Sequence, residues 1–142
     1  MYTIVELEDA MKTTLEAGGL EARIFHGDPQ KGFPGEKLSS PVVFIMFEKS
    51  EESSFKSVQI SGTTFSFRLF STVKNLRSKT SAGRGDISTT GVYELMQSIR
   101  TVLDWSTLGL NIQPLRFVSG KADAMPGGLT VGEQRWLLEV FE

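Results

Sequence analysis

The C-terminal part of this chain begins with a strongly amphipathic stretch, Thr90-Gly-Val-Tyr-Glu-Leu-Met-Gln-Ser-Ile-Arg-Thr-Val-Leu-Asp-Trp105. Its apolar side chains recur every three to four residues and so share one face of a helix: Val92, Leu95, Met96, Ile99, Val102 and Leu103. Thr90 or Gly91 can cap this helix, which we expect to end near Asp104. A helix this short is stable only when packed, so the pattern predicts a sheet that covers its apolar face.

Two strands are predicted after this helix. We expect them near residues 110–118 and 131–141, and Pro114 interrupts the first because proline has no N–H to donate to a sheet. The segment 121–128 contains a proline and two glycines and is predicted to join the two strands.

A second amphipathic helix is predicted near the N-terminus. Apolar residues follow one another at spacings of three, four and four: Ile4, Leu7, Met11 and Leu15. Thr3 and Glu6 match a capping box, in which each side chain accepts a hydrogen bond from the other's free backbone N–H. Gly18 and Gly19 supply a stop after residue 17, because glycine accepts a positive φ.

Strand patterns fill the middle of the chain. A short strand is expected at 21–26, and the apolar run 41–47 predicts a central strand covered on both faces, ended by the polar cluster 48–54. Residues 55–60 and 64–74 are predicted to form a hairpin that turns at 61–63.

In the second arm of that hairpin, alternate residues form a packed face: Phe65, Phe67, Leu69, Ser71 and Val73. The opposite face is expected to be largely wet, and Phe70 interrupts it. Helices and runs of strands without regular alternation predict an α+β fold. We expect one domain over residues 1–142, a mostly antiparallel sheet of about five or six strands, and two helices packed on one face of it.

Bulk composition narrows the class of protein. The 142 residues suit one domain, and a net charge of −2 argues against a dedicated nucleic-acid binder. The chain has no cysteine and one histidine, so thiolate and multi-histidine metal sites are excluded. The early residues lack a signal-peptide pattern, and no apolar run approaches the ~20 residues of a membrane span. We therefore expect a soluble intracellular protein.

Catalytic signatures are absent from the sequence. None of the patterns GxGxxG, GxxxxGK[ST], HExxH or GxSxG occurs, so we predict no catalytic, cofactor-binding or metal-binding residues. The alternative is a small cytoplasmic enzyme that uses His26 with the nearby carboxylates of Asp28 and Glu36, or an adaptor domain with an unrelated partner.

Two long polar loops, at 27–40 and 75–89, are the predicted contact surfaces. Loops of this length are often functional, and the second is locally basic, which favours docking on an acidic protein partner. It lacks the interleaved aromatic residues of a single-strand nucleic-acid surface. The candidate interface residues are Lys31, Phe33, Phe70, Lys74, Arg77, Lys79 and Arg84.

The helix at 90–105 resembles the GxYxLLxxxRxxLxGW helix of tail-terminator, or tail-completion, proteins of tailed phages. It is most similar to the Mu-like prophage minor tail proteins. Pro114-Leu115-Arg116, a loop and a closing strand that ends Leu-Glu-Val-Phe-Glu142 resemble the end of that family. Met96 departs from the leucine-rich family pattern, but this change conserves volume and should be tolerated.

The resemblance implies an α+β domain without catalytic residues that assembles as a ring, typically a hexamer, on the completed tail tube. Such a ring stops tube polymerisation and presents a surface to the head connector, and in Mu-like contractile tails a sheath contact is also implied. It places the protein in the host cytoplasm during assembly and then in the virion tail.

The basic loop generates a test. Lys79→Glu combined with Arg84→Glu should leave the melting temperature unchanged, because both residues lie away from the predicted apolar faces, while assembly is impaired. The charge-conserving double variant Lys79→Arg with Arg84→Lys is the matched control. A large fall in melting temperature of the isolated double-Glu variant would contradict the expectation.

Overall fold

The computed structural model describes residues 2–31, 41–55, 60–74, 91–125 and 129–141. In chain order, the elements are α1 (Ile4–Ala17), β1 (Ala22–Ile24), the 3-10 turn η1 (Pro29–Lys31), β2 (Val42–Phe55), β3 (Ile60–Lys74), α3 (Val92–Leu103), β4 (Arg116–Met125) and β5 (Leu129–Phe141). The chain is therefore α+β, as its sequence predicts.

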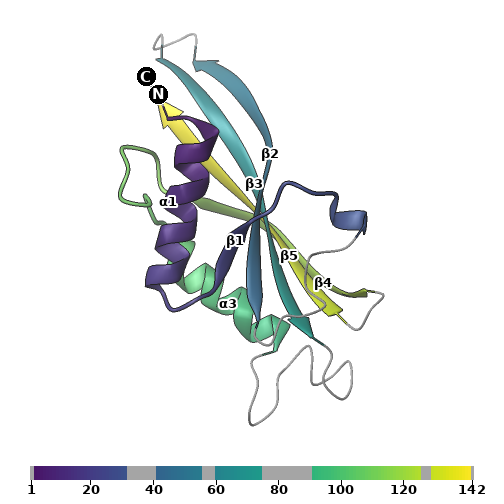
Figure 1. The fold of residues 1–142 in the computed structure, drawn as a ribbon. Coiled ribbons are helices and arrows are strands. Elements are labelled where there is room, and N and C mark those ends of the chain that lie inside the picture. The colour runs from purple at the N-terminus through teal and green to yellow at the C-terminus, as the bar shows by residue number, and fades with distance from the viewer. Residues whose placement is uncertain (1, 32–40, 56–59, 75–90, 126–128, 142) are drawn as a thin grey trace.

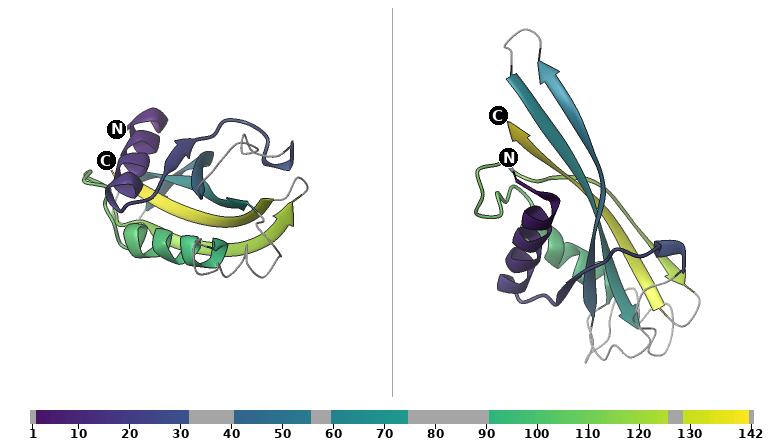
Figure 2. Two further views of the ribbon diagram at one scale, coloured as in Figure 1. Left: turned by 60° about the horizontal axis from the view of Figure 1, so that its bottom comes forward. Right: turned by 45° about the horizontal axis from the view of Figure 1, so that its top comes forward.

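The strands form one five-stranded sheet in the order β1-β2-β3-β5-β4. β1 runs parallel to β2, and every other neighbouring pair is antiparallel. Both helices lie on the same face of this sheet (Figure 1; Figure 2, left). Their apolar side chains join those of β2, β3 and β5 in one core. The predicted arrangement of two helices on one face is confirmed.

α1 begins and ends at the predicted residues. The Thr3 hydroxyl accepts a hydrogen bond from the Glu6 backbone N–H, and the Glu6 carboxylate accepts one from the Thr3 N–H, both at 3.1 Å. At the other end, Gly19 has a φ of +87°. Leu20 donates its backbone N–H to the Leu15 carbonyl at 3.1 Å, which reverses the chain towards β1.

α3 packs its predicted apolar face against the sheet. Its fully buried side chains are Val92, Leu95, Ile99 and Leu103, while Met96 and Val102 are half-buried at the margin. Gly132 in β5 lies directly beneath Met96, and a Cβ at this position would overlap the Met96 side chain. Because Gly132 has no side chain, α3 can approach β5 closely at this position.

The hairpin prediction is wrong in its position. β2 continues through the polar residues 48–54, and Phe55 lies opposite Ile60, so the hairpin joins β2 to β3. Residues 61–63 lie within β3, where Gly62 pairs with both Ser53 and Phe141. Strand propensity is weak beside cross-strand pairing, which extends β2 through residues that composition alone assigns to a turn.

The strand predicted near 110–118 starts later, at Arg116, and extends to Met125. Residues 121–125 are therefore strand and not a connecting loop. The preceding segment is irregular but tied to its surroundings: the Asn111 N–H donates to the Tyr2 hydroxyl at 2.9 Å, and the Leu115 N–H donates to the Ser106 carbonyl at 2.8 Å.

The second face of β3 is not largely wet, contrary to expectation. Ser66, Phe70 and Thr72 are all buried on it. Five buried side chains form a small second core there: Phe25, Val42, Phe44, Phe70 and Val131. Phe25 follows β1 and packs edge-on against Phe44, with ring centroids 5.8 Å apart. β2 is consequently covered on both faces near its start, as its continuous apolar run predicts.

Replacing Ile99 with alanine tests the helix–sheet core. Ile99 is fully buried, so Ile99→Ala should lower the free energy of unfolding by about 2–5 kcal/mol through lost burial and a residual cavity. Urea denaturation measures this change. Tyr93→Ala, on the exposed side of the same helix, is the control and should change stability by no more than about 0.5 kcal/mol. Equal losses for the two variants would contradict the packing.

Candidate assembly surface

Of the seven predicted interface residues, three lie in the described part of the chain, and their surroundings differ. Lys31 is exposed at the end of η1, whereas Phe70 is only 3% exposed and belongs to the second core. Lys74 is the last residue of β3 and pairs with Leu129. Four further candidates lie outside the described residues: Phe33, Arg77, Lys79 and Arg84. Phe70 is covered by other side chains of this chain. Its position on the face of β3 that was predicted to be wet gave no sign of this burial.

His26 links two elements at the surface. Its Nε2 lies 3.2 Å from Glu8 Oε2. The histidine side chain is 76% exposed and the glutamate side chain 6% exposed, so the pair fastens the segment after β1 to α1. Asp28 is exposed, and Glu36 lies outside the described residues. The Glu8 contact gives His26 a structural partner, and the cavity described below is lined by other residues.

A cluster of charged side chains surrounds Glu133 of β5 and is called the Glu133 cluster below. Arg68 Nε contacts Glu133 Oε1 at 3.0 Å, and Arg135 reaches both Glu133 at 3.5 Å and Glu48 at 3.6 Å. Burial alone would raise the pKa of the Glu133 carboxyl, but the hydrogen bonds and charges of Arg68, Lys121 and Arg135 outweigh it and hold the pKa below the ordinary value of 4.5. The cluster joins β2, β3, β4 and β5 across one face.

Both margins of the sheet offer unpaired backbone. β1 pairs with β2 only at residues 43–45, so within the described part of the chain no strand pairs with the outer side of β2 from 46 to 55. β4 is the other edge, and its outer side likewise has no strand partner among the residues described. Open edges of this kind can pair with another chain.

Several apolar side chains on different elements are exposed to water. The most exposed are Val5, Tyr93, Trp105 and Val118. Trp105 is 75% exposed and has a φ of +62°, a conformation that L-residues rarely adopt. Neither property follows from the apolar periodicity of the helix, and in the sequence Trp105 stands out only as the last residue of the family-like stretch.

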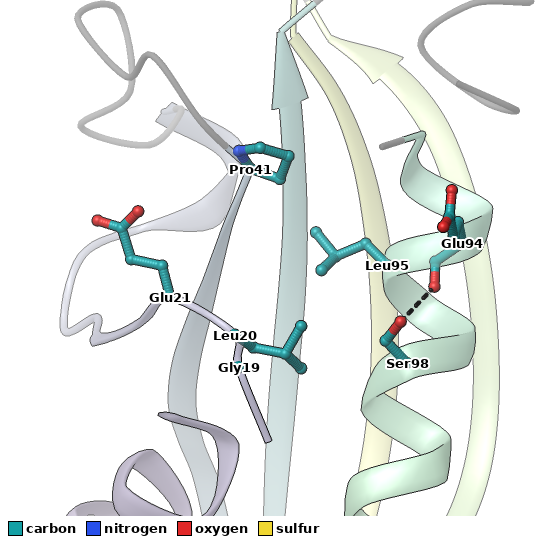
Figure 3. Close-up of a pocket in the computed structure, with 7 residues that line it drawn as sticks. All are labelled: Gly19, Leu20, Glu21, Pro41, Glu94, Leu95 and Ser98. Atoms are coloured by element: carbon teal, nitrogen blue, oxygen red, sulfur yellow. Dashed lines mark hydrogen bonds between the residues drawn. The ribbon is translucent and has the colours of Figure 1, made fainter. Parts of the chain in front are cut away.

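A cavity of about 340 Å³ lies between the turn after α1 and the first half of α3 (Figure 3). Its lining residues are Gly19, Leu20, Glu21, Pro41, Glu94, Leu95 and Ser98. Leu20 and Leu95 point towards each other across it, and the Ser98 hydroxyl donates to the Glu94 carbonyl at 3.0 Å. The lining combines apolar side chains with polar groups, and its exposed surface is more polar than apolar.

Metal-binding clusters and membrane-spanning helices are both absent from the described residues. They contain no cluster of three or more His, Cys, Asp or Glu side chains arranged to hold a metal ion. None of their helices has the length and apolar character required to cross a membrane.

The family model described as "Bacteriophage Mu, Gp37" matches residues 3–125 of this chain. The chain belongs to the bacteriophage Mu Gp37 family. The resemblance to tail-related proteins of Mu-like phages, drawn from the helix at 90–105 and the C-terminal strand, is thereby confirmed, and the chain is a structural, tail-type phage protein.

This Gp37-family chain also shares its fold with a chain of known structure. It is similar to a chain in the "Virion of native gene transfer agent (GTA) particle", with a TM-score of 0.62, 12% sequence identity and 100% of each chain covered. At this identity the likeness concerns the fold, which the two chains share over their whole lengths. Comparison with curated proteins gives no significant match.

The Glu133 cluster of this Gp37-family protein should make its stability depend on pH. Because the pKa of Glu133 is lowered by folding, its contribution is fully present above pH 4.5 and is lost as the pH falls through the folded-state pKa. Glu133→Gln should therefore flatten the fall in unfolding free energy below pH 4.5. Urea denaturation between pH 2 and 7 measures the pH dependence of the unfolding free energy. The variant Glu52→Gln, at an exposed position, is the control. Parallel pH profiles for Glu133→Gln and the wild type would contradict the assignment.

Proposed function

We propose that this protein is a tail terminator: it forms a closed ring at the head-proximal end of the tail tube, ends tube polymerisation and provides the surface for head joining. Membership of the Gp37 family over residues 3–125 is the observation that carries the proposal. The match in fold to a chain of a virion particle supports it, because it extends over the whole chain.

The surface of the domain is suited to heterologous contacts, in which one patch meets a different patch on the next copy. The two sheet margins differ from each other: β2 presents residues 46–55 on one side, and β4 presents its outer edge on the other. Exposed apolar side chains such as Trp105 and Val118 add contact area outside the core. A ring needs such unlike patches, and this domain carries several.

The proposed role is structural and not catalytic. His26, the residue on which an enzymatic reading depends, is mostly exposed and contacts Glu8. In the tail role, the partners of this protein would be further copies of the chain, the tail tube, the sheath and the head-completion protein. The proposal places the protein in the host cytoplasm during assembly and in the virion tail afterwards.

Native mass spectrometry and light scattering of the purified protein test this function. The expected result is a hexamer at high concentration, or on addition of tail tubes assembled from the cognate tube protein. Electron microscopy of the mixtures should show protein bound at one end of each tube, and tubes capped in this way should stop elongating. A protein that stays monomeric and leaves tube ends bare would refute the proposal.

A further inference from the structure

Trp105 is held in a costly position for its residue type. It directly follows Asp104, the C-cap of α3, in the place where helices usually have glycine. Its φ of +62° is disfavoured for any residue with a Cβ, and its side chain is 75% exposed to water. In the isolated chain this indole buries little of its surface, which leaves it available for contact with a partner.

The backbone around Trp105 is fixed on both sides. The Asp104 N–H donates to the Arg100 carbonyl at 2.9 Å, and the Asp104 carboxylate lies 3.6 Å from the Arg100 guanidinium. The Ser106 N–H donates to the Leu103 carbonyl at 2.9 Å, and the Ser106 carbonyl accepts from Leu115. An indole carried on a fixed backbone segment loses only side-chain freedom on binding, which favours a role as an interface anchor.

The cavity at the other end of α3 suits such a side chain. Its volume of about 340 Å³ lies near the lower end of the ~300–1,000 Å³ range of small-molecule pockets, a size for one ring system. Leu20, Pro41 and Leu95 supply apolar contact surface (Figure 3). The Glu94 carboxylate and the Ser98 oxygen on the rim are acceptors that match the single N–H donor of an indole.

We propose that Trp105 of one copy inserts into the cavity between the turn after α1 and the first half of α3 in a second copy of this chain. The proposal rests on the ring function above, and it identifies one contact that closes the ring. Trp105 follows Ser98 by seven residues, a rise of roughly 10 Å along a helix, and Glu94 by eleven, roughly 16 Å. The indole faces water beyond the far end of α3, so it does not fill its own cavity.

This contact is heterologous, because the inserted residue and the receiving cavity are different parts of the same surface. Every copy then presents one protruding Trp105 side chain and one receiving cavity, at opposite ends of α3. Repetition of such a head-to-tail contact gives a closed ring when the rotation between copies closes, and an open filament when it does not.

Single variants test the contact through the dissociation constant of the assembly, measured by sedimentation velocity. Trp105→Ala should raise it at least about 30-fold, as loss of an aromatic hot spot does, whereas Trp105→Phe keeps an aromatic ring and should raise it less than about tenfold. Ser98→Phe fills the cavity and should weaken assembly like Trp105→Ala. Melting temperatures within a few degrees of the wild type establish that each variant is folded.

Mixing two variants gives a sharper result. The Ser98→Phe variant retains Trp105, and the Trp105→Ala variant retains an open cavity. An equimolar mixture therefore allows only one contact, in which Trp105 of the first variant inserts into the cavity of the second. The expected product in native mass spectrometry is a heterodimer with nothing larger. Rings in the mixture, or rings of Trp105→Ala alone with wild-type affinity, would overturn the proposal.

Intrinsic fluorescence reports burial of the indole directly. The chain has two tryptophans, and Trp136 is fully buried in the core, so a blue shift on assembly belongs to Trp105. Trp105→Phe should show no shift. An assembled wild type whose emission remains that of an exposed indole would overturn the inference while leaving the terminator function intact. A wild type that never assembles would overturn both.

Discussion

The close approach of α3 to β5 is the constraint on which the rest of the structure depends. Gly132 leaves room for Met96, and Gln134, almost fully buried, donates its side-chain amide to the Met96 carbonyl at 3.0 Å. Ile99 of α3 and Trp136 of β5 are both fully buried in the core between this helix and the sheet. A buried amide that meets a helix carbonyl fixes position as well as contributing stability, because displacement would leave both groups unpaired.

Docking of α3 also sets what the domain can offer to partners. With both helices on one face, the sheet keeps two unlike margins, and the second face is partly closed by Phe25 and the small core around Phe70. The turn after α3 then projects Trp105 into water at one end of the helix, while the cavity beside Leu95 opens at the other. A packed core thus holds two complementary surface features at a fixed separation.

Local signals identified both helices and their ends. The capping box at Thr3 and the glycine after residue 17 act within one turn of chain, so the sequence alone predicts them. The apolar run at 41–47 likewise predicted a strand covered on both faces. The hairpin position failed because polar residues 48–54 are held in β2 by pairing with β3, and composition carries no information about that pairing. The candidate site was predicted less well, since exposure of Trp105 and burial of Phe70 depend on distant segments.

Sequence alone was enough to predict the helices, the α+β class and the resemblance to Mu-like tail proteins, because periodicity, caps and motifs are local properties of the chain. Only the tertiary structure decided the strand order, the partner of β2 and the sheltering of Phe70 by Phe25. It alone placed an exposed indole and a partly apolar cavity at opposite ends of α3. The physical reason is that burial and pairing are made by residues far apart in sequence, and their energies are fixed only when the whole sheet is assembled.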